Sequence, residues 1–149
     1  MVFRRVWLLT LIAISATAAV PGCSGHASGI KETAVPVKGR VTNAGQPLKI
    51  SNAMVGWVEV IFLEPKGEGK QTAAGEKFTT HADENGRFTA PGRLGNGLPP
   101  GKYRIAVRQW DPFPQADKLG GKFDEKNTKI VRDVTGKEEI AIDVSRPEG

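Results

Sequence analysis

From Val35 onward, apolar residues recur at every second position in short runs, and Gly or Pro residues separate these runs. In the run KYRIAVRQW, for example, Tyr103, Ile105 and Val107 fall on one face, with small or charged residues between them. A period of two indicates strands that bury one face. No segment after residue 22 shows the sustained i, i+3, i+4, i+7 spacing of an amphipathic helix. The alternation therefore predicts an all-β domain.

The same pattern predicts the remaining strands. They are expected in VPVKGRVT (35–42), WVEVIFLEP (57–65), the two halves of EKFTTHADENGRFTA (76–90), KIVRDVT (129–135) and EEIAIDVS (138–145). In DENG, the Asp83 and Asn85 side chains can accept or donate local hydrogen bonds, and Gly86 can adopt a positive φ, so a turn is expected there rather than a calcium loop. Several short strands at regular spacing suggest a sandwich or barrel of roughly seven strands over residues 35–149.

The first 22 residues have the three parts of an export signal. Arg4 and Arg5 form a basic region, VWLLTLIAISATAAV is apolar, and Pro and Gly precede Cys23. The apolar run is short for a membrane-spanning helix, which needs about 20 predominantly apolar residues. We therefore expect residues 1–22 to be a cleaved signal peptide.

Cys23 is the only cysteine of the chain. It has no partner for an intramolecular disulfide, and no apolar periodicity surrounds it that would indicate a buried thiol. VPGC resembles the bacterial lipobox, with Val20 and Gly22 at the matching positions. That resemblance implies cleavage before Cys23 and lipidation of its side chain and new N-terminus with acyl chains such as palmitate, and two or more chains hold a protein stably on a membrane.

Residues 23–34 follow this cysteine as a small, polar, non-periodic stretch, which we expect to be a flexible tether between the lipid and the domain. Ser24 carries no acidic retention signal of the kind known in some bacterial lipoproteins. The expected location is therefore the cell envelope, anchored to the outer membrane.

The charge of the chain argues against nucleic acid as a partner. The formal net charge is +5, and two of these charges, Arg4 and Arg5, belong to the expected signal peptide. The remaining Lys and Arg residues alternate with acids and glycines instead of forming a basic stripe. An envelope protein or a polysaccharide remains the expected partner besides the membrane.

Four motifs resemble those of carboxypeptidase-regulatory-like, or transthyretin-like, domains. They are the strand and turn of VKGRVTNAGQPL, the following strand to FLEP, the hairpin HADENGRFTA and the strand LPPGKYRIAV, within Val35 to Val144. The tail from Gly120 to Val144 is similar to that of small planctomycete lipoproteins that carry this domain alone behind a lipobox. The resemblance implies a seven-stranded antiparallel Ig-like or prealbumin-like β-sandwich used for scaffolding or recognition, without catalytic residues or a cofactor.

The sequence shows no residue pattern that is typical of a catalytic site or a metal site. A nucleophilic serine needs a nearby base, and the chain has two histidines, one of them His26 in the tether. A zinc site needs three or four ligands at suitable spacing, which the sequence does not offer. Paired carboxylates of a hydrolase would have to come from positions that look solvated. We therefore expect no enzyme, no metal site and no cofactor.

The segment WDPFP contains residue types that are common in binding sites. Trp110 and Phe113 could present an aromatic platform, with Arg108 and Gln109 beside it, or they could fold back to plug the open end of the sandwich, as large aromatics more often do. The expected function is therefore a membrane-anchored, non-catalytic lipoprotein that serves envelope structure, adhesion or accessory protein binding. The alternative is a carbohydrate- or substrate-binding module that assists a separate enzyme.

Overall fold

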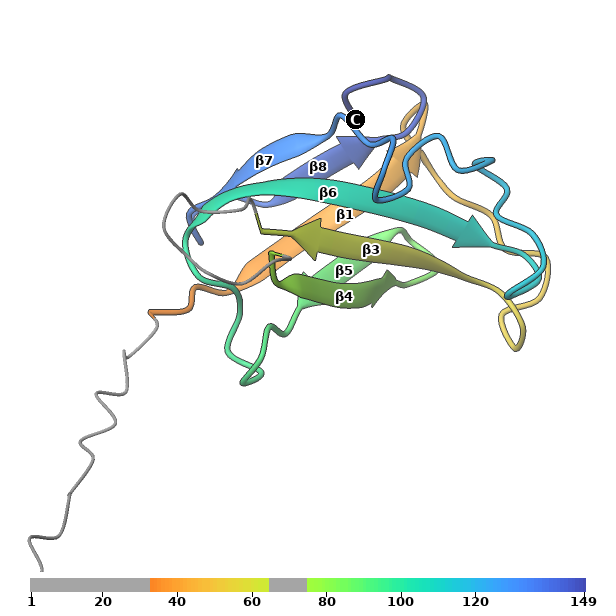
Figure 1. Cartoon of the computed structure of the whole chain (residues 1–149). Coiled ribbons are helices and arrows are strands. Elements are labelled where there is room, and N and C mark those ends of the chain that lie inside the picture. Colours follow the sequence, from red (N-terminus) through yellow and green to blue (C-terminus); the bar gives the residue numbers. More distant parts are fainter. Residues whose placement is uncertain (1–32, 65–74) are drawn as a thin grey trace, which may run out of the picture. The chain divides into compact units, whose positions relative to one another are not determined.

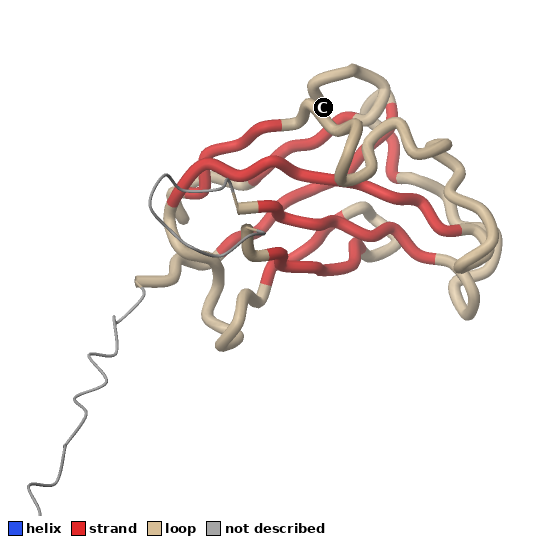
Figure 2. Tube along the Cα trace, in the orientation of Figure 1, coloured by secondary structure: helices blue, strands red, loops and turns tan. Residues whose placement is uncertain are grey.

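Eight strands and no helix make up the part of the chain that the computed structural model describes, residues 33–64 and 75–149 (Figures 1 and 2). The strands are β1 (Val37–Asn43), β2 (Gln46–Pro47), β3 (Trp57–Leu63), β4 (Lys77–Ala82), β5 (Arg87–Ala90), β6 (Gly101–Trp110), β7 (Val131–Val134) and β8 (Ile140–Asp143). In this part of the chain no helix could cross a membrane. The predictions for the signal peptide and for Cys23 lie outside the described residues.

Two four-stranded sheets pack face to face. In the first sheet, β1 pairs with β2 and β5 in antiparallel fashion and with β8 in parallel. In the second sheet, the order β4-β3-β6-β7 is antiparallel throughout. The predicted all-β sandwich is thus confirmed.

Two details differ from the expected seven antiparallel strands. The eighth strand is β2, whose two residues lie in the part of VKGRVTNAGQPL that the sequence indicates as a turn. The parallel pair arises because β8 follows β7, which belongs to the opposite sheet, so no hairpin connects β8 to β1 and fixes an antiparallel direction.

The core lies between the sheets and is built from the inward positions that the alternation predicts. Val41 and Ile142 of the first sheet and Val60 and Ile105 of the second are fully buried. Phe62 contacts Phe88 of the opposite sheet edge to face, with ring centroids 6.0 Å apart. Such contacts across the sheets hold the two layers together.

The DENG turn carries the chain from the second sheet to the first. The Asp83 carboxylate accepts hydrogen bonds from the backbone amides of Asn85 and Arg87, both at 2.8 Å, and Gly86 has a φ of 76°. The predicted turn chemistry is confirmed. The Thr80 hydroxyl then donates to the Thr89 carbonyl at 2.8 Å, so the edges β4 and β5 are joined where the sheets meet.

The far edge of β6 is paired along its whole length. β7 covers only Gly101 to Arg104. Beyond it, the amides of Ile105 and Val107 donate to the carbonyls of Ile130 and Phe123, at 2.9 and 2.8 Å. Residues 111–130, the irregular stretch between β6 and β7, therefore continue the sheet edge. This stretch also places Phe123 in the core, with 2% of its surface exposed, which the sequence pattern did not predict.

Gly39, in the middle of β1, lies directly between its partners Phe88 of β5 and Ile140 of β8. A Cβ atom at this position would lie 2.1 Å from Phe88 Cζ and 2.6 Å from the Ile140 carbonyl oxygen. Both distances are shorter than van der Waals contact, so only glycine lets Phe88 pack over β1 while β8 pairs with it.

We expect Gly39→Ala to destabilise the domain by about 1–3 kcal/mol or more, because the added methyl group overpacks the core against Phe88. Gly101→Ala is the matched control, since a Cβ there would meet only Tyr103 Cε2 at 3.9 Å. Its effect should stay within about 0.5 kcal/mol. Urea denaturation of the two variants measures both effects, and equal stability of the two would contradict the packing argument.

Candidate functional site

Two loops meet at the end of the sandwich opposite to the one where β1 begins (Figure 1). One loop, residues 48–56, leads into β3, and the other, residues 111–117, follows β6. The Asp111 carboxylate accepts hydrogen bonds from the Ser51 amide at 2.9 Å and the Ser51 hydroxyl at 2.7 Å. The Phe113 amide donates to the Val55 carbonyl at 2.7 Å. These bonds fix each loop against the other.

The pKa of Asp111 lies below its usual value because of this contact. The hydrogen bond from the Ser51 amide is the main cause, the Ser51 hydroxyl adds to it, and the positive charge of Lys118 contributes further, while burial acts in the opposite direction. The ionised carboxylate is therefore the form that holds the loops together.

Three aromatic side chains, which we call the aromatic corner, meet beside these loops: Trp57 at the start of β3, Trp110 at the end of β6, and Phe113 on the loop that follows β6. The Phe113 ring stacks on the Trp57 indole, with centroids 4.4 Å apart and an interplanar angle of 28°. Trp110 stands nearly perpendicular to Phe113, at 5.4 Å and 86°. Even so, 45% of Phe113 is exposed. Phe113 is thus both folded back onto the sheet and presented to solvent.

Arg108 lies beside the aromatic corner on the outer face of the second sheet. Its guanidinium is 5.7 Å from the centroid of the Trp110 ring. It lies between the carboxylates of Glu59 and Glu125, each with an oxygen 3.6 Å away, and its side chain is 27% exposed. The Trp110 indole also donates to Glu59 at 3.2 Å. The structure therefore brings together all three residues that the sequence suggested for ligand binding: Arg108, Trp110 and Phe113.

Sequence reasoning missed Trp57, Glu59 and Glu125 as parts of this surface. The register of β3 and β6 sets Trp57 opposite Trp110 and Glu59 opposite Arg108. Each strand shows its own alternation in the sequence, but which residues face each other across the pair depends on tertiary register. Glu125 comes from the irregular stretch, which has no periodicity to read.

Two donors in this surface lack acceptors. Within residues 33–64 and 75–149, no hydrogen bond reaches the Arg108 guanidinium, because 3.6 Å is too long for one. The Trp57 indole N–H is buried and also has no partner among the described residues. The Arg108 guanidinium is partly exposed and can therefore bond an acceptor supplied from outside, whereas the buried Trp57 indole N–H is out of reach of such an acceptor.

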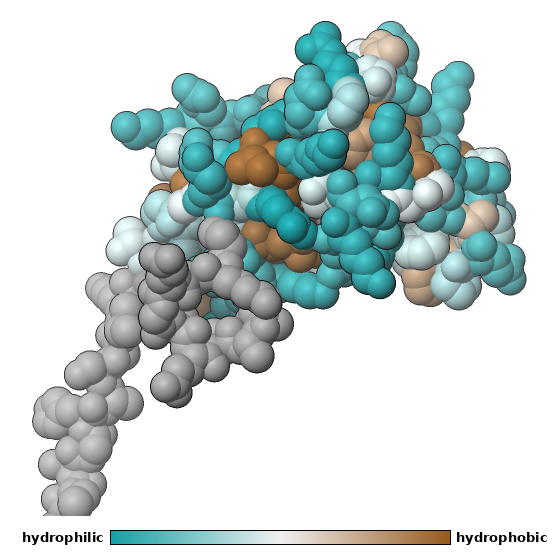
Figure 3. Space-filling view, turned by 45° about the horizontal axis from the view of Figure 1, so that its top comes forward, coloured by the Kyte–Doolittle hydropathy of each residue, from teal (hydrophilic) through white to brown (hydrophobic). Residues whose placement is uncertain are grey.

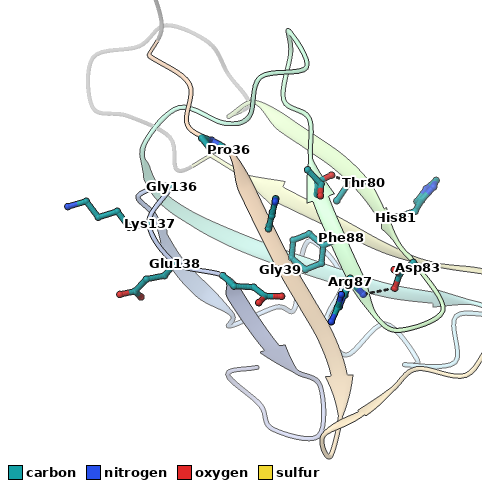
Figure 4. Close-up of a pocket in the computed structure, with 13 residues that line it drawn as sticks. Pro36, Gly39, Thr80, His81, Asp83, Arg87, Phe88, Gly136, Lys137 and Glu138 are labelled. Atoms are coloured by element: carbon teal, nitrogen blue, oxygen red, sulfur yellow. Dashed lines mark hydrogen bonds between the residues drawn. The ribbon is translucent and has the colours of Figure 1, made fainter.

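Two hollows open on the domain, and one of them lies beside the aromatic corner. The one in Figure 4, of about 760 Å³, is lined by charged side chains of both signs, including Lys38, Arg87 and Glu138. In that view Lys137 and His81 point away from it. The other, of about 910 Å³, lies between residues 46–58 and 82–85 and includes Trp57. It therefore borders the aromatic corner.

The surface in Figure 3 carries several small apolar patches separated by polar side chains, without one broad apolar face. Among the described residues, no three His, Cys, Asp or Glu side chains gather closely enough to hold a metal ion. The aromatic corner with Arg108 combines an exposed aromatic ring with charged side chains of both signs.

No family model, curated protein or solved structure matches the chain. The resemblance of the four motifs to carboxypeptidase-regulatory-like domains accordingly stays a prediction.

We expect Asp111→Asn to destabilise the domain at neutral pH, because an amide bonds Ser51 more weakly than a carboxylate does. A carboxylate with a lowered pKa stabilises the fold above its unfolded-state pKa, and this contribution disappears as the pH falls through the folded-state value. The stability difference between wild type and variant should therefore shrink below about pH 4 and vanish at lower pH.

Thermal unfolding from pH 7 to pH 2 measures this difference. Asp133→Asn is the control, because the Asp133 side chain is exposed and lies 4.0 Å from Lys102. A constant gap between wild type and Asp111→Asn across this range would show that the charge of Asp111 does not hold the loops.

Proposed function

We propose that this protein is a membrane-anchored, non-catalytic lipoprotein whose β-sandwich recognises a partner in the cell envelope. The observation that carries the proposal is Phe113, an aromatic ring that is 45% exposed although it is stacked on Trp57. Exposed aromatic side chains that are held in place are typical of binding surfaces. Adhesion or accessory binding follows from such a surface more directly than a purely structural role.

The position of this surface agrees with a lipid anchor at Cys23. The proposed tether ends where β1 begins, and the aromatic corner lies at the other end of the sandwich (Figure 1). A flexible chain of the tether's length spans on average roughly 20 Å. A flexible tether would let the domain turn at the membrane, so a lipid anchor at Cys23 is compatible with a partner bound at the aromatic corner.

A non-catalytic role is supported by how the aspartates are used. Asp83, Asp117, Asp124 and Asp143 each accept hydrogen bonds from two or more backbone amides. Such bonds stabilise turns, which gives these four carboxylates a structural role. The resemblance to carboxypeptidase-regulatory-like domains supports the same role.

Intact-mass spectrometry of the chain purified from bacterial membranes tests the proposed anchor. We expect a mass equal to residues 23–149 plus acyl chains, and we expect Cys23→Ala to lose both the acyl chains and the cleavage before residue 23. A chain without acyl groups, cut elsewhere, would contradict the lipid anchor and indicate a secreted domain.

A further inference from the structure

We propose that the aromatic corner and Arg108 form a binding site for a neutral pyranose unit of a polysaccharide. This inference names the ligand class for the recognition role proposed above and rests on that role. It combines three observations: a fixed, exposed ring, neighbouring hydrogen-bond donors without acceptors, and a balanced local charge.

The ring of Phe113 is held in place before any ligand arrives. It stacks on Trp57 at 4.4 Å, its amide bonds Val55, and the preceding Asp111 bonds Ser51. Ordering such a ring on binding costs little conformational entropy. A pyranose presents a flat face of C–H groups, which packs on an aromatic ring, and the perpendicular Trp110 supplies a second wall.

The hydrogen-bond donors of Arg108 favour a ligand that carries oxygen acceptors. Arg108 offers guanidinium N–H groups that form no hydrogen bond within the described part of the chain, and its side chain is 27% exposed, so a ligand can reach them. Sugar hydroxyls accept hydrogen bonds from such donors and at the same time donate to carboxylates, so Glu59 and Glu125 can bond the same hydroxyl groups. A purely apolar ligand would form no hydrogen bond with any of these groups.

The charges around Arg108 favour a neutral sugar. Arg108 lies between Glu59 and Glu125, and Lys77 of β4 pairs with Glu125. Arg104, which donates to the Glu125 backbone carbonyl, and Asp124, which attracts Arg108, also lie nearby, so three positive and three negative side chains cancel and leave no surplus positive charge to bind a uronate or a sulfate. The two carboxylates beside Arg108 would repel such an acidic group.

An apolar protein partner is the competing occupant. Met54, 91% exposed, and Val55 lie on the loop beside Phe113 and would enlarge an apolar docking surface. Met54 offers no hydrogen-bond donor and is not in the aromatic stack, so a sugar on Phe113 and Arg108 does not need it. Met54→Ala therefore separates the two occupants.

The test uses the full chain purified in a detergent without a sugar headgroup. The probes are neutral hexaoses of glucose, mannose, galactose and xylose in α and β linkages, with hexagalacturonate as the acidic probe. Calorimetry measures binding, and tryptophan fluorescence reports on the aromatic corner. We expect at least one neutral hexaose to bind and to change the tryptophan emission, and hexagalacturonate to bind at least about tenfold more weakly.

Four variants locate the site. Phe113→Ala should weaken binding of the neutral hexaose by about tenfold or more, because it removes the stacking ring. Arg108→Lys keeps the charge but loses the planar donor fork, and it should weaken binding as well. Met54→Ala and Leu94→Ala should bind as the wild type does, since Leu94 is 80% exposed on the distant loop 91–100.

The proposal is overturned if no neutral hexaose binds, if hexagalacturonate binds as well as the neutral probes, or if Phe113→Ala binds normally. A loss of binding in Met54→Ala equal to that in Phe113→Ala would instead indicate apolar docking. None of these results would change the mass expected for the lipidated chain, so the sugar site and the lipid anchor are tested independently. Sugar binding by a chain without acyl groups would contradict the membrane anchor alone.

Discussion

The backbone amides on the far edge of β6 must find acceptors, and the rest of the candidate site depends on how they do so. β6 is the longest strand and β7 covers less than half of it. A buried amide without a partner costs about 1–3 kcal/mol, so the edge from Ile105 onward could not stay open inside the fold. The chain after β6 closes it, with Ile130 and Phe123 as acceptors and the Asp117 side chain as the acceptor for Gln109.

This edge pairing determines the position of the aromatic corner. Because Asp117 and Phe123 are fixed along β6, the segment between Trp110 and Asp117 has to turn back within a few residues. The turn lies against residues 51–55, where Ser51 bonds Asp111 and Val55 bonds Phe113. Phe113 then rests on Trp57, which the register of β3 with β6 has brought beside Trp110. An exposed ring is thus held by sheet pairing and by only a few loop bonds.

Local features of the fold could be predicted from the sequence, and features that depend on distant pairing could not. Alternation in WVEVIFLEP places Val58, Val60 and Phe62 in the core, and the DENG turn follows from its side-chain chemistry. The parallel pairing of β8 with β1 and the burial of Phe123 depend on contacts between residues far apart in the chain. No local pattern encodes them. For the same reason Arg108, Trp110 and Phe113 could be suggested as a ligand surface, but Trp57 and Glu59 could not.

Hydrogen exchange measured amide by amide tests most directly whether the irregular stretch is a fixed extension of the sheet. Along β6, the amides of Ile105, Val107 and Gln109 donate to this stretch, and those of Ala106 and Arg108 alternate toward β3. If the stretch is fixed, both sets exchange at similarly slow rates, since the same cooperative unfolding has to expose them. Fast exchange of the first set beside a protected second set would show that the edge opens on its own. The aromatic corner would then have no rigid support.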